Sequence, residues 1–219
     1  MKVIITGSSS GMGLAATKKF VDMGHEVHGL DLWPMRDSIC NSANYHHYIV
    51  DVREFNALPR IEDVQIVINN AGLIESGQDI EVNLIGTMNV TENYVLGNSS
   101  IRSVLNQSDA CAKRGIGPAY YVASKGGVVS YTKWTAREIA MFGATCNCLS
   151  FGGVLTRSND MIVDCEDSWN AVMESTPLKK WTDLNEVAEW IYFMTVVNKS
   201  CSGQDIVIDN LESLNGEYI

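Results

Sequence analysis

Hydrophobic and polar positions follow two alternating periods along the chain. Short runs of apolar and β-branched residues recur, and most of them precede a longer stretch with apolar residues at helical spacing. This alternation predicts a parallel sheet covered by helices on both faces. We expect one Rossmann-like α/β domain over residues 1–219, a doubly wound parallel sheet of about seven strands. The predicted strands are Lys2–Thr6, Glu26–Asp31, Tyr45–Val50, Val64–Asn69, Ile101–Asn106, Ala144–Ser150 and Asp205–Ile208, and the predicted helices are Met12–Met23, Gln78–Leu96, Tyr120–Phe142, Glu166–Glu174 and Asp183–Val197.

The first predicted strand runs directly into a glycine-rich loop and then a helix, the context that a dinucleotide-binding loop requires. Gly7 would permit the tight turn, Gly11 would let the backbone approach a pyrophosphate, and Gly13 would let helix and strand pack closely. The spacing departs from the Gly-x-Gly-x-x-Gly fingerprint, and a flexible turn rich in serine is the alternative. The expected cofactor contacts in this loop are Gly7, Ser9, Ser10, Gly11, Met12 and Gly13.

One aspartate, Asp31, ends the second predicted strand, and another, Asp51, follows the third. A carboxylate at Asp31 would accept hydrogen bonds from the ribose hydroxyls of NAD and repel the 2′-phosphate of NADP. The serines of the glycine-rich loop supply no cation to offset that repulsion, so NAD(H) is favoured over NADP(H), although Arg36 lies close in sequence and Asp31 could be an ordinary turn residue. Asp51 would meet the adenine edge, with a plain turn residue as the alternative.

Tyr121 and Lys125 stand four residues apart in a predicted helix, which places them on one face. A neighbouring ammonium favours the phenolate, so Lys125 is expected to lower the pKa of Tyr121 from its ordinary value of about 10. The phenol could then exchange a proton with a substrate oxygen. Many such pairs are only surface spacing, so the weight of this pair depends on its context.

Four signals stand in order along the chain: the glycine-rich loop, an Asn-Asn-Ala-Gly turn at 69–72, a serine thirteen residues before Tyr121, and the Tyr-x-x-x-Lys pair. Together they resemble the classical short-chain dehydrogenase/reductase family over essentially the whole length. The resemblance implies that Ser108 hydrogen-bonds the substrate oxygen, that Tyr121 is the general acid/base, and that Lys125 holds the nicotinamide ribose and depresses the tyrosine pKa. Asn83 matches the asparagine that supports a water and proton relay. The resemblance adds Asn70, Ala71, Gly72, Tyr121, Lys125 and Thr156 to the expected cofactor contacts.

The chain departs from the family pattern in several places. Phe151 replaces a proline of the segment that ends at Thr156, and Asn210-Leu211 replaces two glycines near the end. Only ten residues separate Gly72 from Asn83, and this compactness resembles the 3α-hydroxysteroid dehydrogenase/carbonyl reductase-like branch. The segment 157–177 is the expected substrate lid. Its apolar residues would either face the substrate or pack the lid's own helix, and they are Met161, Ile162, Val163 and Trp169.

Composition narrows the function classes. With 16 basic and 26 acidic residues, the net charge of −10 argues against nucleic acid as a partner. The longest apolar run is less than half of a membrane span, and no signal-peptide pattern is present, so we expect a cytoplasmic protein with no membrane contact. Six cysteines contain no Cys-x-x-Cys pair, which indicates reduced thiols, and we expect no metal in the site.

These observations predict an NAD(H)-dependent oxidoreductase that interconverts a secondary alcohol and a ketone. A 3-oxoacyl-acyl-carrier-protein reductase is an alternative that Asp31 and the acidic charge disfavour. A nucleotide-sensing protein without turnover is another, because fold does not prove function. The resemblance also implies a homodimer or homotetramer that packs through the helices at 78–96 and 120–142.

Overall fold

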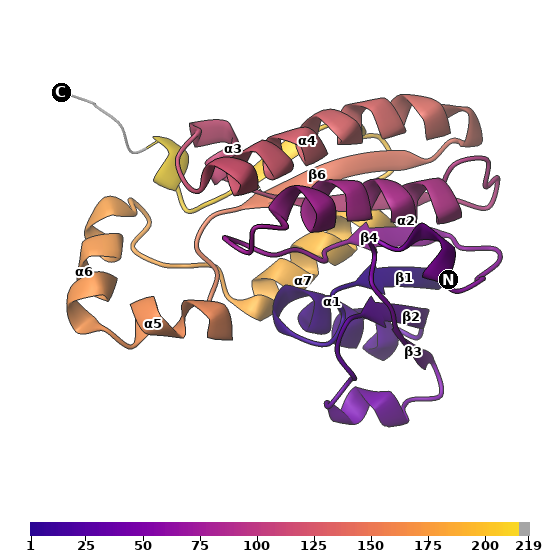
Figure 1. Cartoon of the computed structure of the whole chain (residues 1–219), viewed down its shortest axis with the longest axis horizontal. Coiled ribbons are helices and arrows are strands. Elements are labelled where there is room, and N and C mark those ends of the chain that lie inside the picture. Colours follow the sequence, from indigo (N-terminus) through magenta and orange to yellow (C-terminus); the bar gives the residue numbers. More distant parts are fainter. Residues whose placement is uncertain (215–219) are drawn as a thin grey trace.

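Seven parallel strands form one sheet in the order β3-β2-β1-β4-β5-β6-β7, with helices on both faces (Figure 1). The computed structural model describes residues 1–214. It confirms the predicted Rossmann-like fold and the existence of all seven strands. The strands are β1 Lys2–Thr6, β2 Glu26–Asp31, β3 Tyr45–Ile49, β4 Ile66–Asn69, β5 Ser103–Asp109, β6 Thr145–Phe151 and β7 Asp205–Ile208, and the α-helices are α1 Gly11–Asp22, α2 Gly86–Tyr94, α3 Cys111–Arg114, α4 Ala119–Ile139, α5 Asp160–Val163, α6 Glu166–Ser175 and α7 Leu184–Tyr192.

Each face of the sheet has its own hydrophobic core. Successive side chains of a strand point to opposite faces, so Ile5 of β1 packs in the core with Phe20 of α1, whereas Ile4 packs in the core that includes Val90 of α2. All four side chains are fully buried. Burying a side chain of this size contributes about 1.5–3 kcal/mol, which explains why the strand sequences are apolar almost throughout.

The helix predicted over 78–96 is in fact two elements. A π-helical turn, Ile80–Ile85, precedes α2, and a second π-helical turn, Phe193–Val197, follows α7. π-turns insert one residue into the helical repeat and are frequent at functional sites. Here the first turn carries Asn83, whose side chain is buried.

Strand β5 extends three residues beyond its predicted end at Asn106. Its parallel pairing with β6 continues through Ser108, opposite Ser150, to Asp109, opposite Phe151. Ser108 and Asp109 therefore both belong to the strand, and adjacent strand residues point to opposite faces. This extension decides which of the two side chains reaches the site.

The segment 157–177 stands beside the sheet as α5 and α6 (Figure 1). Met161 is 89% exposed, so it does not pack against the helices of this segment. Ile162, Val163 and Trp169 are half-buried, and the Trp169 ring meets Trp181 edge-on with centroids 5.3 Å apart. Among residues 1–214, no helix has the length and apolarity needed to span a membrane.

Candidate active site

The sheet topology brings the sequence motifs to one edge. β1, β4 and β5 are neighbours in a parallel sheet, so their carboxyl ends lie side by side. The glycine-rich loop follows β1, the turn at 70–72 follows β4, and Asp109 ends β5. Ligands of open parallel sheets bind at such carboxyl ends, where the strand order reverses direction. Helix α4 adds Tyr121 and Lys125 to the same edge.

The glycine-rich loop has the geometry of an anion-binding turn. Gly7 and Gly11 have φ angles of 65° and 49°, which other residues rarely adopt. At Gly13 a Cβ atom would lie 1.9 Å from the carbonyl oxygen of Gly7, so only glycine allows this close approach. Ser10 precedes α1 without a side-chain capping bond, which leaves the N–H groups of the first turn available to a pyrophosphate.

The turn after β4 fastens this loop. Asn70 donates through Nδ2 to the carbonyl oxygens of Thr6 and Gly7 at 3.0 and 3.2 Å. The backbone N–H groups of Asn70 and Ala71 both donate to Thr6 Oγ1, at 3.0 and 2.9 Å. Asn70 and Ala71 therefore hold the predicted cofactor loop in shape.

The two predicted adenosine-side aspartates lie in different surroundings. Asp31 is buried, and its carboxylate accepts from the backbone N–H of Ser9 at 2.9 Å and of Trp33 at 3.0 Å. Each oxygen keeps a lone pair that a ribose hydroxyl could use. The Asp51 carboxylate forms an ion pair with Arg53, with Nη2 and Oδ2 2.6 Å apart, and the Arg53 hydrogen bond lowers the pKa of Asp51. Arg53 thus holds the carboxylate of Asp51, and the contact of Asp51 with adenine stays a prediction.

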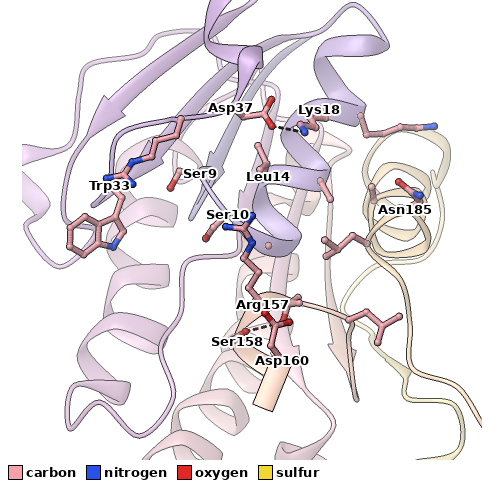
Figure 2. Close-up of a pocket in the computed structure, with 18 of the residues that line it drawn as sticks. Ser9, Ser10, Leu14, Lys18, Trp33, Asp37, Arg157, Ser158, Asp160 and Asn185 are labelled. Atoms are coloured by element: carbon pink, nitrogen blue, oxygen red, sulfur yellow. Dashed lines mark hydrogen bonds and ion pairs between the residues drawn. The ribbon is translucent and has the colours of Figure 1, made fainter. Parts of the chain in front are cut away.

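A groove of about 1300 Å³ runs from the glycine-rich loop along α1 (Figure 2). Ser9 and Ser10 line one part, Trp33 stands at one side, and Arg157 approaches from the start of the segment after β6. Thr156 also lines the groove, with its Cγ2 3.9 Å from where a Cβ on Gly11 would lie. The N–H groups at the start of α1 could bind an anion such as a pyrophosphate at this end of the groove. Met12 contributes differently, since its Sδ accepts from Gln107 Nε2.

Tyr121 forms its hydroxyl hydrogen bond with Asp109. The Tyr121 Oη donates to Asp109 Oδ2 at 2.9 Å, and the other carboxylate oxygen accepts from the backbone N–H of Cys111 at 2.8 Å. Ser108 is buried and donates to the carbonyl oxygen of Lys125 at 3.0 Å. The hydrogen bonds thus place Asp109 on the phenol, while Ser108, predicted to contact the substrate oxygen, is directed to the backbone of α4. The cause is the extension of β5, which gives these neighbours opposite directions.

Lys125 does not act on Tyr121 as the sequence predicts. Its buried Nζ donates to the carbonyl oxygen of Gln107 at 3.2 Å and lies 5.6 Å from the centre of the Tyr121 ring. Burial raises the pKa of Tyr121 far above its ordinary value, and the Asp109 charge and hydrogen bond raise it further. Burial lowers the pKa of Lys125, against the opposing effect of Asp109. The expected lowering of the tyrosine pKa is therefore wrong for this structure, and the phenol is protonated at neutral pH.

Asn83 joins three parts of the site. Its Nδ2 donates to the carbonyl oxygen of Leu73 at 2.9 Å and to Ser124 Oγ at 3.0 Å, while Oδ1 accepts from the Leu73 N–H at 2.8 Å. A Cβ on Gly72 would lie 3.2 Å from Asn83 Oδ1 and 3.3 Å from Lys125 Nζ. The structure thus brings Gly72, Asn83 and Lys125 together, with the Asn83 side chain committed to protein partners.

A second cluster could hold a metal ion, although none was expected from the sequence. The ligand atoms of Glu26, His28 and His46 all lie within 4.8 Å of one another on β2 and β3. His28 Nε2 is 3.1 Å from Glu26 Oε1. Glu26 begins β2, whereas the cofactor groove follows the carboxyl ends of the strands, so this cluster is separate from the site around Tyr121.

Comparison with known proteins identifies the family. A family model described as enoyl-(acyl carrier protein) reductase matches residues 7–210. The chain belongs to the short-chain dehydrogenase/reductase family. As a short-chain dehydrogenase/reductase it is an oxidoreductase, which confirms the class predicted from the motifs.

Several relatives of this short-chain dehydrogenase/reductase have names that indicate different substrates. It is 27% identical to a 3-oxoacyl-acyl-carrier-protein reductase of Chlamydia pneumoniae, over 95% of each chain. It is 24% identical to the L-fucose dehydrogenase of Mus musculus, over 94% of this chain and 86% of the relative. The compact hydroxysteroid-type branch stays a prediction.

Solved structures agree on the fold. A 4-hydroxyisoleucine dehydrogenase mutant complexed with NADH and succinate has a TM-score of 0.89 at 20% identity, with 98% of this chain and 99% of that chain covered. A protein described as a 2-deoxy-D-gluconate 3-dehydrogenase from Agrobacterium tumefaciens, with bound NADP, has a TM-score of 0.88 at 21% identity, with 96% and 95% covered. At these identities the likeness establishes the fold alone.

Proposed function

We propose that this protein is an NAD(H)-dependent oxidoreductase. It would transfer a hydride between the nicotinamide and a substrate carbon and so interconvert a secondary alcohol and a ketone, or a similar pair of compounds. The observation that carries the proposal is the position of Tyr121 and Lys125, one turn apart on α4, at the strand edge that carries the glycine-rich loop. The bound cofactor supplies the hydride chemistry, and the protein orients it. Lys125 would hold the nicotinamide ribose, and Thr156 would face the carboxamide.

Tyr121 is proposed as the proton donor for the reductive direction. Its raised pKa keeps the phenol protonated at neutral pH, because burial and Asp109 both disfavour the phenolate. A protonated phenol can give its proton to the substrate atom that gains charge as the hydride arrives. In the oxidative direction the same oxygen, as phenolate, would accept the proton.

The preference for NAD(H) rests on Asp31. Its buried carboxylate lies at the end of β2 next to the Ser9 backbone, where it would meet the adenosine ribose and repel a 2′-phosphate. Arg36 lines the same groove and is the candidate partner for such a phosphate. Lys18 is paired with Asp37 at 2.6 Å. The related structures include one with NADH and one with NADP, so the fold accommodates both cofactors.

A 3-oxoacyl-acyl-carrier-protein reductase is the second candidate, favoured by the name of the bacterial relative. The net charge of −10 opposes it, because an acidic carrier protein would be repelled. A cofactor-binding protein without turnover is the third candidate. The presence of Asn83, Tyr121 and Lys125 together speaks against that candidate.

Oxidation of NADH and of NADPH, followed in parallel against ketones, a cyclic imine and an acetoacetyl thioester, tests these alternatives. We expect turnover with NADH on a small substrate and little turnover with NADPH. Preference for the thioester with NADPH would support the carrier-protein reductase. Tight NADH binding measured by fluorescence, without turnover on any substrate, would support the sensing role.

We also propose that the protein forms a homodimer or homotetramer and that residues 157–177 cover the substrate. Trp134 of α4 is 45% exposed and stacks on Tyr131, which gives this helix an apolar outer surface. An exposed apolar surface of this kind is typical of contact between subunits. Light scattering that finds a monomer at working concentration would reject the assembly.

A further inference from the structure

The group that accepts the hydrogen bond of the Tyr121 hydroxyl is a carboxylate and not a neutral side chain such as serine. Asp109 Oδ2 accepts the phenol proton at 2.9 Å, and Oδ1 accepts from the Cys111 N–H. A serine at this place could donate to a substrate oxygen, whereas an ionised carboxylate only accepts. During reduction of a carbonyl, negative charge develops on the oxygen beside this carboxylate. Asp109 therefore opposes the charge that a ketone reductase has to stabilise.

A second carboxylate, that of Asp79, is buried and its charge acts on the phenol. Asp79 is 3% exposed, and its Oδ2 accepts from the Ser76 N–H at 3.2 Å. Its Oδ1 is buried and has no hydrogen-bond partner among the described residues. The charge of Asp79 contributes, after burial and Asp109, to the raised pKa of Tyr121. Lys125 Nζ lies 5.6 Å from the centre of the phenol ring.

We infer that the substrate carries a basic nitrogen at the reacting carbon and that the enzyme reduces the C=N bond of an imine. The inference rests on the proposed hydride transfer and narrows its substrate class. Asp109 would accept a hydrogen bond from the protonated nitrogen, and Asp79 would add to the negative potential around it. The buried Asp79 Oδ1 has no partner among the described residues, which is costly, and the positive charge of the iminium formed in the site would offset the charge of both carboxylates.

The reaction balances with the reduced nicotinamide as the source of the hydride. The imine nitrogen takes a proton from Tyr121, which regains one from solvent, and forms an N–H bond. The hydride then forms a C–H bond at the imine carbon while the C=N π electrons become the nitrogen lone pair. The products are the amine and the oxidised nicotinamide. Positive charge is lost from the nitrogen during this step, so no anion forms beside Asp109.

Matched substrates and an Asp109→Ser variant test the inference. Methylpyrroline, a stable cyclic imine, and cyclopentanone, a ketone of similar size, would be compared as substrates with NADH. We expect wild type to favour the imine in kcat/KM by at least about tenfold. Because one donor to a developing oxyanion is worth about 10²–10³-fold, Asp109→Ser should raise ketone reduction by roughly 10- to 100-fold and lower imine reduction. Asp109→Asn, which removes the charge and keeps the shape, should lower imine reduction as well.

Binding provides a readout that does not depend on turnover. Pyrrolidine, which is cationic at neutral pH, and tetrahydrofuran, its neutral oxygen counterpart, would be titrated into the complex with NAD. Wild type should bind pyrrolidine more tightly, and Asp109→Ser should lose that preference while its NADH dissociation constant changes by less than about twofold. Equal binding of the two rings by wild type, or an imine preference that survives in Asp109→Ser, would overturn the inference. Failure of NADH to bind would instead contradict the proposed function.

Discussion

The backbone N–H of Ser9 donates to Asp31 Oδ2 at 2.9 Å, so the carboxylate expected to select the cofactor also fastens the glycine-rich loop to the end of β2. The other oxygen of Asp31 accepts from the Trp33 N–H at 3.0 Å. Asp31 therefore orients the loop on one side and the chain after β2 on the other. Substitutions at this position have to separate the effect of charge from the effect of loop support.

Asp31→Ala should weaken NADH binding and improve NADPH binding. The variant loses the ribose hydrogen bonds and the repulsion of the 2′-phosphate, each worth about 1–3 kcal/mol. Asp31→Asn is the matched control, because its amide oxygen can still accept from one backbone N–H while the charge is gone. Dissociation constants from fluorescence titration measure both variants. An unchanged preference in Asp31→Ala would show that Arg36 or another group reads the ribose.

Tyr121→Phe should lower kcat by about 10²–10⁴-fold, the usual contribution of general acid catalysis. NADH affinity should stay nearly constant, because the ring that packs beside Lys125 is retained. Steady-state kinetics on the substrate of the wild type, with NADH titration alongside, provide the comparison. A variant that keeps most of its activity would remove Tyr121 from proton transfer.

Lys125→Met should reduce both turnover and cofactor affinity, because Lys125 is proposed to bind the nicotinamide ribose. It should also make the fold more stable. Burial lowers the pKa of Lys125 in the native state, so the charged lysine opposes folding, and this penalty is fully present at pH values below the native-state pKa. That penalty shrinks as pH rises toward the unfolded pKa of about 10.4. Thermal unfolding at several pH values should show a Tm gain for Lys125→Met that becomes smaller as pH rises, and a Tm loss would contradict it.

Proton donation by Tyr121 should continue to high pH. Because its folded-state pKa is raised above the unfolded value, the phenol stays protonated through about pH 10, where a free tyrosine ionises. The rate of reduction should therefore not fall through ionisation of Tyr121 at any pH below about 10. Asp109→Asn removes a negative charge and should bring ionisation of Tyr121 to lower pH. Ultraviolet titration of the phenolate without cofactor measures the pH at which Tyr121 ionises, after subtraction of the signal of Tyr121→Phe. If Asp109→Asn does not change that pH, Asp109 does not control the ionisation of Tyr121.

Two glycine substitutions should have opposite effects on stability. Gly13→Ala would place a Cβ 1.9 Å from the Gly7 carbonyl oxygen, so it should destabilise the protein by about 1–3 kcal/mol and weaken NADH binding. Gly126→Ala adds its Cβ within α4, where no atom lies within 4 Å, and should stabilise by about 0.5–1 kcal/mol. Chemical denaturation measures both values. Equal effects would mean that the loop relaxes around the added methyl group.

The sequence by itself determined the fold class, the order of the elements and the position of the glycine-rich loop between β1 and α1. Strand and helix periods are local properties, and the glycines at 7, 11 and 13 have backbone requirements that few other residues meet. Tyr121 and Lys125 are likewise tied by helical spacing alone, which is why their common face could be predicted. These features depend on neighbours in the chain.

Tertiary structure decided which side chain meets Tyr121 and in what charge state. Counting thirteen residues back from Tyr121 points to Ser108, but the pairing of β5 with β6 carries the strand to Asp109 and turns the two side chains to opposite faces. The pKa of Tyr121 also depends on burial and on a carboxylate twelve residues away in sequence. Residue spacing does not determine the partner or the pKa of Tyr121, because these depend on strand register and desolvation in the folded molecule.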